Sequence, residues 1–402
     1  MERLLPPRQA IVAFLSRVEI PAPPSEVVAL DDAPGRVLAE MIAADADYPA
    51  AARSLMDGFA LRAQATPGAF EIADDVRMGS APANTLDGSL ASRIPTGGVL
   101  PLGADAVVPI EEARVAEGRV IVDAQFAEGE NVVERGADMR RGDLVIAAGR
   151  RIRAPQIGVL ATLGRTTVAV YRRPVIAVFS SGDELIDPAR TPRPGQIRDS
   201  NRHVVAASLR AMGAIPRHYA TLRDEAPEFE SAIAAAISEC DAVVVTGGSS
   251  VGERDRLPRA VAAIADPGVV VHGLRVKPGK PTLFGADRRK PIIGLPGNPT
   301  SALMILEAVA RPIVAALAGA AIIVPTRQAR LAEPARSRAE WTWYIPVRLE
   351  EDGGLPLAHP LPLRSFSVSL AARADGYVVM DERDAEWPSG AVVSVHGFLG
   401  AA

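Results

Sequence analysis

The sequence predicts a multidomain chain of the α/β and β classes, in which a doubly wound α/β domain is combined with small β domains. Residues 173–322 alternate strand-like and helix-like segments, as βαβ units do. Residues 47–142 hold short apolar runs separated by Gly and Pro and show no long helical pattern. Residues 323–402 return to strand patterns around a hairpin signal. A chain of 402 residues is long enough for about two to four domains.

The N-terminal segment begins with a helical pattern that three prolines end. A short strand is expected at 27–30 and a second helical piece at 35–42. Residues 143–172 have the pattern strand, helix, strand, and we expect them to pack back onto the N-terminal segment. The sequence therefore predicts a discontinuous N-terminal domain (1–46 and 143–172) with a β domain (47–142) inserted into it. The apolar residues of the first helix have helical spacing: Ala10, Ile11, Phe14, Leu15 and Val18.

The central region, 173–322, predicts a parallel, doubly wound sheet with helices on both faces. The expected strands are Val175–Phe179, Ile215–Ala220, Ala242–Val245, Val269–His272, Pro281–Phe284 and Pro291–Leu295. The expected helices are Arg202–Met212, Pro227–Glu239, Pro258–Ile264 and a last one that starts near Ser301. Residues 323–402 predict a small β-barrel domain, because two strand patterns flank the turn 351–354 and a third closes the chain.

Three glycine- and proline-rich loops lie within about sixty residues of the central region. In an open α/β sheet such loops meet at the carboxyl ends of the strands, where ligands bind. Glycine and serine there can turn backbone N–H groups toward an anion, so the loops predict a phosphate- or oxyanion-binding crevice. Taken one at a time, each loop is equally typical of a tight turn. The loop residues are Gly247, Gly248, Ser249 and Ser250, then Lys277 and Lys280, then Pro296, Gly297, Asn298 and Pro299.

The inserted β domain carries two further motifs. Asp57 lies on a glycine turn, and Thr96 lies on a Gly-Gly loop where its hydroxyl and the open N–H groups could contact an anion. The alternatives are a type I turn for the first motif and a hairpin loop for the second. Each motif alone favours its structural alternative.

Composition excludes several functional classes. A net charge of −4 with no basic run argues against general nucleic-acid binding. A single cysteine, Cys240, excludes a disulfide framework and a cysteine-rich zinc site. We expect no signal peptide and no membrane span, since the longest apolar stretch, 313–324, is short and suits a packed helix end. The expected location is cytoplasmic.

Seven motifs occur along the chain in a fixed order, and together they resemble the molybdopterin molybdenumtransferase family (MoeA and the gephyrin E domain). The resemblance covers nearly the whole chain and thins after residue 325. It implies an elongated four-domain homodimer whose α/β domain is a MogA-like molybdopterin-binding domain. The motifs are SLMDGFAL, IPTGGVLPLGADAVVPIE, SSGDEL, GQIRDSN, TGGSSVGERD, KPGKP and LPGNPTSA.

The resemblance also implies a reaction. Adenylylated molybdopterin and molybdate would react, AMP would leave and molybdenum cofactor would result, with a divalent cation such as Mg²⁺. A molybdopterin adenylyltransferase and molybdoenzyme chaperones would be further partners, whereas nucleic acid and membrane would not.

Four acidic positions match the family's motifs and would be catalytic: Asp57, Glu184, Asp224 and Asp255. Asp57, Glu184 and Asp255 would hold the metal, because clustered carboxylates accept an anionic substrate only with a cation between them. The alternative for each acid is a solvated turn or a helix cap. Beside the loop residues above, the resemblance adds Thr96, Asp138 and Ser369 as substrate-binding positions, with lysines supplying positive charge to oxyanions.

The chain departs from the family pattern at several places. Around Val133 the usual Arg is absent, and Ala137 stands in place of an acid, although Asp138 is kept and Arg135 or Arg140 could substitute. A basic residue is usual at Gly273, and a Gly-Ser-Gly segment is missing from the last domain, where Asp375 replaces the usual Asn. These departures leave open a divergent paralogue that uses tungstate or a modified pterin. The resemblance also leaves open a non-catalytic binding or scaffold protein, as gephyrin's relatives suggest, and an adenylyl transferase, which shares the α/β domain.

Overall fold

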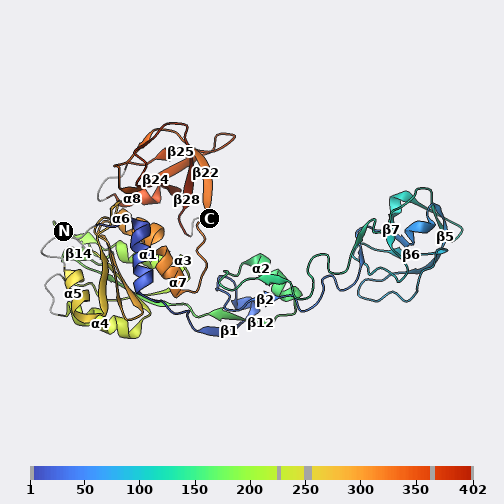
Figure 1. Ribbon diagram of the computed structural model, residues 1–402, viewed down its shortest axis with the longest axis horizontal. Helices are drawn as coiled ribbons and strands as arrows, with labels where there is room; N and C mark the ends of the chain where they lie inside the picture. The colour runs from blue at the N-terminus through green and yellow to red at the C-terminus, as the bar shows by residue number, and fades with distance from the viewer. Residues whose placement is uncertain (1–3, 224–227, 249–255, 363–366, 400–402) are drawn as a thin grey trace. The chain divides into compact units, whose positions relative to one another are not determined.

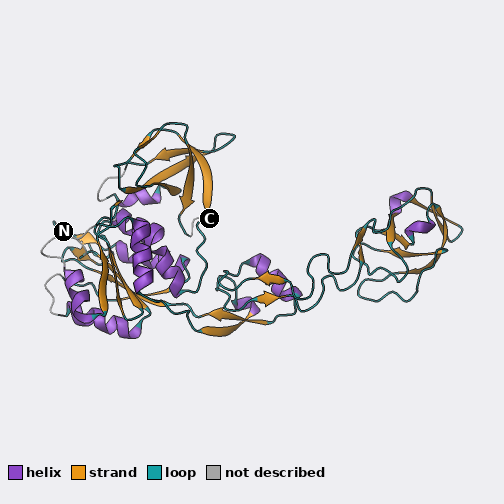
Figure 2. Ribbon diagram, viewed as in Figure 1, coloured by secondary structure: helices purple, strands orange, loops and turns teal. Residues whose placement is uncertain are grey.

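The computed structural model describes residues 4–223, 228–248, 256–362 and 367–399. They form two compact units. The first unit comprises Met1–Ala39, Gly149–Ala154 and Thr167–Ala402, and the second comprises Glu40–Ala148 and Pro155–Thr166. Figure 1 labels their elements along the chain, and Figure 2 shows helices mixed with strands around the central sheet.

A six-stranded sheet forms the centre of the first unit, in the order β16-β13-β17-β21-β20-β18. The first four strands in that order run parallel to one another, whereas β20 runs antiparallel to both β21 and β18. The strands are β13 (Val175–Ser180), β16 (Ile215–His218), β17 (Ala242–Thr246), β18 (Pro267–His272), β20 (Leu283–Asp287) and β21 (Lys290–Leu295).

The expected parallel sheet is wrong at one strand, β20, which runs antiparallel to both of its neighbours. Only Arg288 and Arg289 separate β20 from β21, and Arg288 has a positive φ of 55°. A two-residue connection can join only antiparallel neighbours, because a parallel crossover needs a dozen or more residues. The doubly wound α/β class is confirmed, and the hairpin of β21 and β20 lies next to the edge strand β18.

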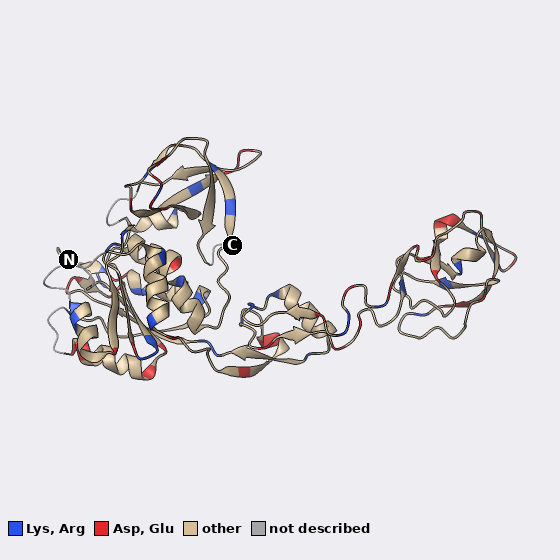
Figure 3. Ribbon diagram, in the orientation of Figure 1, with Lys and Arg blue, Asp and Glu red and all other residues tan. Residues whose placement is uncertain are grey.

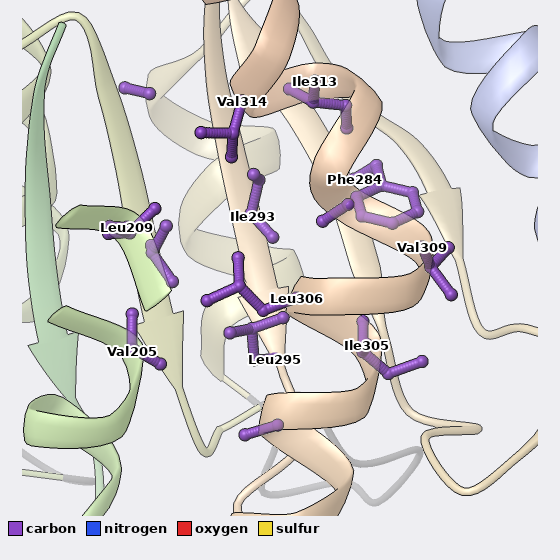
Figure 4. Packing of buried hydrophobic residues seen from close by; sticks show 14 of the residues in the cluster. Val205, Leu209, Phe284, Ile293, Leu295, Ile305, Leu306, Val309, Ile313 and Val314 are labelled. Carbon is purple, nitrogen blue, oxygen red and sulfur yellow. The ribbon is translucent and has the colours of Figure 1, made fainter. Parts of the chain in front are cut away.

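Helices cover both faces of this sheet. One core contains Ile176, Val178, Val244 and Ile293, and the other contains the alternate residues of the same strands, such as Ala177. Figure 4 shows Leu306 of the last helix against Ile293 and Leu295, with Val205 and Leu209 of α3 beside them. The helices are α1 (Pro7–Arg17), α3 (Asn201–Ala211), α4 (Phe229–Glu239), α5 (Arg256–Ile264), α6 (Pro299–Met304), the π-helix η4 (Ile305–Ala310) and α7 (Arg311–Leu317).

The last helical stretch, Pro299–Leu317, is the one helix among the described residues that is long and apolar enough to cross a membrane by length and composition. Within its most apolar window, 72% of the residues are buried inside the fold. Its apolar surface is therefore already covered by the sheet and by α3, as expected of a core helix.

A closed five-stranded barrel forms the C-terminal part of the first unit, which confirms the expected small barrel. Its strands pair in the cycle β24-β25-β22-β28-β26, and β26 pairs again with β24. The short strand β19 adds to β24 from outside the barrel. The elements are β19 (Val276–Lys277), β22 (Thr326–Leu331), β23 (Ala335–Arg336), β24 (Thr342–Glu350), β25 (Leu357–Pro360), α8 (Val368–Ala372), β26 (Gly376–Met380), β27 (Glu386–Trp387) and β28 (Val392–Gly397).

Three short ladders complete the described part of the first unit, one of them between β23 and β27. The strand β1 (Ser25–Ala29) pairs antiparallel with β12 (Thr167–Tyr171), and β14 (Leu185–Ile186) pairs with β15 (Ile197–Arg198). The short helix η1 (Leu30–Asp32) follows β1.

The helical piece expected at 35–42 is wrong. Val37 and Leu38 make isolated bridges with Arg151 and Val170, and Ile42 begins a strand. Backbone pairing with these distant segments replaces the local helical hydrogen bonds, although the same apolar residues are buried.

A six-stranded sheet in the order β7-β4-β6-β5-β9-β8 forms the centre of the second unit. Two small ladders, β2 with β11 and β3 with β10, accompany it. Figure 3 shows acidic and basic residues interspersed in both units. The elements are β2 (Ile42–Ala43), β3 (Arg53–Ser54), β4 (Gly58–Leu61), η2 (Ala63–Ala65), β5 (Gly68–Asp75), β6 (Leu90–Ile94), β7 (Ala106–Pro109), η3 (Ile110–Glu112), β8 (Ala113–Ala116), β9 (Arg119–Val122), β10 (Val132–Val133), β11 (Leu144–Ile146) and α2 (Ala154–Thr162).

Candidate functional site

The loops after β13, β17 and β21 meet at the carboxyl ends of the parallel strands. Gly247 N–H donates to the carbonyl of Leu295 at 3.0 Å, and Ser181 N–H donates to the carbonyl of Thr246 at 2.8 Å. A Cβ built on Gly297 would lie 3.6 Å from Gly247 Cα. These loops are therefore neighbours, and two of them, the glycine loop and the loop that contains Gly297, are among the three that were expected to meet at this edge of the sheet.

Glycine is required at 247 by both conformation and space. Its φ is 84°, and an added Cβ would lie only 2.5 Å from the carbonyl oxygen of Ser181. Gly248 continues with a positive φ of 63°. The Gly-Gly pair thus allows the loop to pack closely against its neighbour.

The loop between β21 and α6 is fixed by Asn298, which caps the helix. Its Oδ1 accepts the N–H of Ser301 at 3.2 Å and the Ser301 hydroxyl at 3.3 Å. Asn201, in α3, donates from Nδ2 to the carbonyl of Gly297 at 2.8 Å. Pro299 takes the first helical position, where its missing N–H costs no hydrogen bond.

The loop that contains Lys277 and Lys280 is held by its own backbone and by Thr282. The Thr282 hydroxyl donates to the carbonyl of Gly279 at 2.6 Å, and the carbonyl of Lys280 accepts the N–H of Leu274 at 2.8 Å. These bonds leave the two ammonium groups on the exposed side of an ordered loop.

A pocket of about 440 Å³ opens between this lysine loop, the start of α6 and the barrel. It contains three cationic side chains, and no acidic side chain is among the described residues that line it. Of the 44 basic residues in the sequence, three are lysines and the others are arginines. Two of these three lysines, Lys277 and Lys280, line this pocket. The lining residues are Val276, Lys277, Pro278, Gly279, Lys280, Pro281, Asn298, Thr300, Ser301, Arg338, Trp341 and Trp343.

The barrel contributes Arg338, Trp341 and Trp343, which the motifs did not indicate. They reach the pocket because β19 pairs with β24, with Lys277 opposite Trp343. Two tryptophans spaced i and i+2 at the start of a strand pattern are a signal that could have indicated a shared face. Figure 1 shows α6 and α8 beside each other between sheet and barrel, where the Thr300 hydroxyl donates to the carbonyl of Ser367. Ser369 is exposed on α8.

Glu184 lies in the first unit, in the loop that follows β13. It is exposed, and a Cβ on Gly182 would lie 2.5 Å from its Oε2. The absence of a side chain at 182 therefore lets this carboxylate lie against the loop backbone near the carboxyl end of the sheet.

Asp57 and Thr96 lie together in the second unit. Asp57 Oδ1 accepts the backbone N–H of Thr96 at 2.7 Å and its hydroxyl at 3.1 Å. Both residues are on exposed loops next to β4 and β6. The expected residues Asp224, Ser249, Ser250 and Asp255 lie outside the described residues.

Residues in the segment 133–140, where the sequence departs from the family pattern, make hydrogen bonds to the segment around Asp47 and Tyr48. Asp138 is exposed, and its N–H donates to the carbonyl of Tyr48 at 3.1 Å. Arg135 donates to Asp47 at 2.7 Å, and the pKa of Asp47 is held below its usual value first by the N–H of Arg141 and then by Arg135. Arg135 is thus engaged with a protein carboxylate.

The other two departures also have local roles. Gly273 has a φ of 83°, and an added Cβ would lie 2.6 Å from Leu4 Cδ2, so a basic side chain does not fit there without rearrangement. Asp375 Oδ2 accepts the N–H of Leu349 at 2.7 Å and so joins two strands' ends in the barrel.

A metal centre is not assembled within the described parts of either unit, where no three His, Cys, Asp or Glu side chains lie together. Of the three expected metal ligands, Asp57 is in the second unit, Glu184 is in the first and Asp255 is outside the described residues. Carboxylate oxygens are nevertheless the ligand type that Mg²⁺ prefers, so the donor chemistry fits.

Comparison with known proteins matches three family models along the chain. They are the MoeA N-terminal region (domain I and II) at residues 5–164, a probable molybdopterin binding domain at 177–316 and the MoeA C-terminal region (domain IV) at 328–398. Together they span most of the sequence in the order expected from the motifs.

Relatives and a solved structure agree with these matches. The molybdopterin molybdenumtransferase of Bacillus subtilis is 31% identical over 388 residues, 92% of this chain and 89% of that protein. The enzyme of the same name from Staphylococcus epidermidis is 35% identical over 303 residues, 74% of this chain and 72% of that protein.

The crystal structure of the molybdopterin biosynthesis MoeA protein of Pyrococcus horikoshii has a TM-score of 0.79 and 30% identity, and the match covers 99% of this chain and 100% of that one. The resemblance inferred from the ordered motifs is confirmed at the level of sequence, fold and domain models. The chain belongs to the molybdopterin molybdenumtransferase family, which is a family of transferases.

Proposed function

We propose that this chain inserts molybdate into adenylylated molybdopterin and releases AMP, with Mg²⁺ as the divalent cation. The observation that carries the proposal is the cationic pocket formed by the lysine loop, the Asn298 loop and the barrel, in a chain that matches named molybdopterin molybdenumtransferases over most of its length. Both substrates are anions, and both would be attracted by the same three cations.

The pocket residues have separable roles in this proposal. Lys277 and Lys280 bind oxyanions as compact point charges, and Arg338 adds a planar donor from the barrel. Thr300 and Ser301 line the same wall, where their hydroxyls already donate to the carbonyl of Ser367 and to Asn298 Oδ1 and so fix the shape of the wall. The glycine loop would supply the backbone N–H of Gly248 for a phosphate, together with Ser249 and Ser250, because the N–H of Gly247 already donates to the carbonyl of Leu295.

The carboxylates Asp57, Glu184 and Asp255 would hold Mg²⁺, with Asp224 as a further catalytic acid. When bound, Mg²⁺ neutralises phosphate charge and lets carboxylates and an anionic substrate occupy one site. Asp57 also orders the loop at Thr96, which would contact the substrate. Asp138 and Ser369 complete the proposed substrate contacts.

The proposal includes the organisation that the family implies. The chain would act as a cytoplasmic homodimer with the four-part division 1–46 with 143–172, 47–142, 173–322 and 323–402. A molybdopterin adenylyltransferase would supply its substrate, and molybdoenzyme chaperones would receive its product. Sedimentation equilibrium measures the mass directly, and a monomer at working concentrations contradicts the dimer.

The decisive test is release of AMP by purified protein given adenylylated molybdopterin, molybdate and Mg²⁺. The expected result is AMP in step with formation of molybdenum cofactor, lost when Mg²⁺ is chelated and recovered when it is restored. Absence of AMP release with every divalent cation tried rejects the proposal, and tight pterin binding without turnover indicates a binding or scaffold protein instead.

A parallel measurement with tungstate separates the divergent alternative. Equal amounts of molybdate and tungstate compete in the same assay, and the metal content of the product is counted. A preference for molybdate supports the proposal, whereas a preference for tungstate assigns the chain to the other oxyanion. Formation of adenylylated molybdopterin from ATP would instead identify an adenylyl transferase.

A further inference from the structure

Two indoles form one wall of the cationic pocket. Trp341 immediately precedes β24 and Trp343 lies in it, so the spacing of two residues places both side chains on one face of the strand. Thr342, between them, is buried on the opposite side, where its hydroxyl donates to Glu382 Oε1 at 3.0 Å. The pocket therefore presents flat aromatic surface as well as positive charge.

Cations accompany both rings. Lys277 Nζ lies 4.0 Å from the centre of the Trp343 ring, and Arg338 Cζ lies 5.4 Å from the centre of the Trp341 ring. The ladder fixes the first contact, because Lys277 stands opposite Trp343 in the β19–β24 register. Such contacts orient a charge toward the ring face without neutralising it, so the cations keep their attraction for an anion.

Trp343 also lines a second pocket. This second pocket has a volume of about 260 Å³, apolar side chains predominate in it, and Lys277 is shared with the first. A bare oxyanion is bound by cations and hydroxyls and gains nothing from two indoles. The wall therefore suits a ligand in which an anionic group is attached to a flat ring. The second pocket is lined by Lys277, Pro334, Ala335, Arg336, Trp343, Ile345, Pro360, Leu361 and Pro362.

We propose that Trp341 and Trp343 form a stacking subsite for a planar nitrogen heterocycle that carries a phosphate, and that they select this part of the substrate. The inference rests on the proposed function, in which the substrate has two such heterocycles, a pterin and an adenine. The heterocycle stacks on indole while Lys277, Lys280 and Arg338 bind the attached phosphate. The barrel thus acts as a specificity element for a site built mainly by the α/β sheet.

If Trp341 and Trp343 have a purely structural role, their replacement has a different effect on ligand binding. If the indoles only hold Lys277 and Arg338 in place, their loss weakens the binding of every phosphate, with or without a ring. If they stack on a heterocycle, their loss weakens only ligands that contain one. The comparison of AMP with ribose 5-phosphate separates the two roles, because these ligands share the phosphate and the ribose and differ in the adenine.

The experiment measures the affinity of the full chain for three probes by isothermal titration calorimetry. The probes are AMP, 6-hydroxymethylpterin phosphate and ribose 5-phosphate. The variants are Trp341→Leu and Trp343→Leu, with Trp341→Phe and Trp343→Phe as conservative partners that retain an aromatic face. Trp387→Phe is the matched control, since the chain's third tryptophan lies in β27 and lines neither pocket. Thermal unfolding confirms that each variant is folded.

The expected result is that one heterocyclic probe binds wild-type protein on the order of tenfold more tightly than ribose 5-phosphate, as stacking on aromatic side chains provides. The Leu variants lose this advantage, the Phe variants keep most of it and Trp387→Phe is unchanged. The probe that shows the advantage identifies which half of the substrate occupies the wall.

Equal affinities of wild-type protein for all three probes, including no binding of any, overturn the proposal. So does an equal loss for all three probes in the Leu variants. The assay involves no turnover and is therefore independent of the proposed reaction. A protein that stacks AMP on its tryptophans but releases none from adenylylated molybdopterin would contradict the reaction and leave the subsite standing.

Discussion

The carboxylate of Asp57 holds the backbone of Thr96, because its Oδ1 accepts the N–H of Thr96 at 2.7 Å and the hydroxyl at 3.1 Å. Two motifs that lie 39 residues apart in sequence are thereby joined at one edge of the second unit. An acid predicted to be catalytic therefore also orders a loop predicted to bind substrate. The two roles can be separated by changing the charge without removing the acceptor.

Asp57→Asn retains an oxygen that can accept the Thr96 N–H but removes the negative charge. If the charge is needed at the reacting centre, we expect AMP release to fall by about 100-fold, the scale of losing one electrostatic group in a catalytic site. The melting temperature should change by no more than about 2 °C, since one exposed hydrogen bond is retained in neutral form. Turnover and thermal unfolding are measured on the same preparation.

Asp87 provides a matched control within the same unit. Its Oδ1 also accepts a backbone N–H and a hydroxyl, both from Ser89, at 2.8 and 2.6 Å. Asp87→Asn should leave AMP release unchanged. Full activity of Asp57→Asn, or equal loss in both variants, would show that the charge of Asp57 has no special function.

Gly279→Ala should damage the lysine loop specifically. The φ of Gly279 is 109°, and an added Cβ would lie 2.3 Å from Ile305 Cδ1, which is buried in the core. We expect a loss of about 1–3 kcal/mol in the free energy of unfolding from strain and overpacking. The same displacement moves Lys277 and Lys280, so the affinity for molybdate should fall as well, which equilibrium dialysis measures.

Gly142→Ala separates conformational strain from the clash. Gly142 has a comparable φ of 94°, but no atom lies within 4 Å of an added Cβ. Its replacement should cost about 1 kcal/mol and leave molybdate affinity intact. If the two variants lose equal stability and Gly279→Ala binds molybdate normally, the packing of Gly279 against Ile305 does not position the lysines.

The order of strands and loops along the chain could be predicted because it depends on local periodicity. The place where the loops meet could be predicted from a general rule for open α/β sheets. Apolar runs such as Ala242–Val245 end in glycine, and parallel strands bring their carboxyl ends to one edge. The segment at Val37 could not be assigned in the same way. Its apolar spacing suits a helix, but pairing with distant backbone determined its conformation.

The barrel's part of the site could not be predicted from motifs. Trp343 reaches Lys277 only through the β19–β24 ladder, a pairing across more than sixty residues that no local pattern indicates. The residues outside the described ranges, Asp255 among them, stay predictions. The structure thus adds cationic and aromatic surface to a site whose acids were inferred from the sequence.

The buried pair of Glu307 and Arg311 should dominate the stability of the last core helix. Arg311 Nη2 lies 2.8 Å from Glu307 Oε2, and the side chains are 5% and 1% exposed. Arg311→Met leaves a buried carboxylate without its cation, so we expect a loss of about 3–5 kcal/mol. Urea unfolding, followed by tryptophan fluorescence and by circular dichroism, measures the change.

The double variant Glu307→Leu with Arg311→Met tests the cause of that loss. Removing both charges should recover most of the stability, since the uncompensated charge is responsible for the cost. The recovery should be incomplete, because Glu307 Oε2 also accepts the N–H of Leu399 at 3.1 Å. A double variant as unstable as Arg311→Met would assign the loss to packing and not to charge.

Stability should also rise with pH through the range in which His396 titrates. Burial, and then the nearby charge of Arg311, lowers the pKa of His396 below 6.5, and its ring is stacked on Tyr377 at 5.4 Å between centroids. Between the lowered native pKa and about 6.5, the unfolded chain binds more protons than the native chain, so protonation favours unfolding. The contribution is complete above about 6.5 and is lost as the pH falls toward the native pKa. His396→Gln should reduce the difference in urea-unfolding free energy between pH 5.5 and 7.5, and NMR titration of the ring in wild-type protein should give a midpoint below 6.5. A native midpoint at or above that value would contradict the burial of the imidazole as the source of the pH dependence.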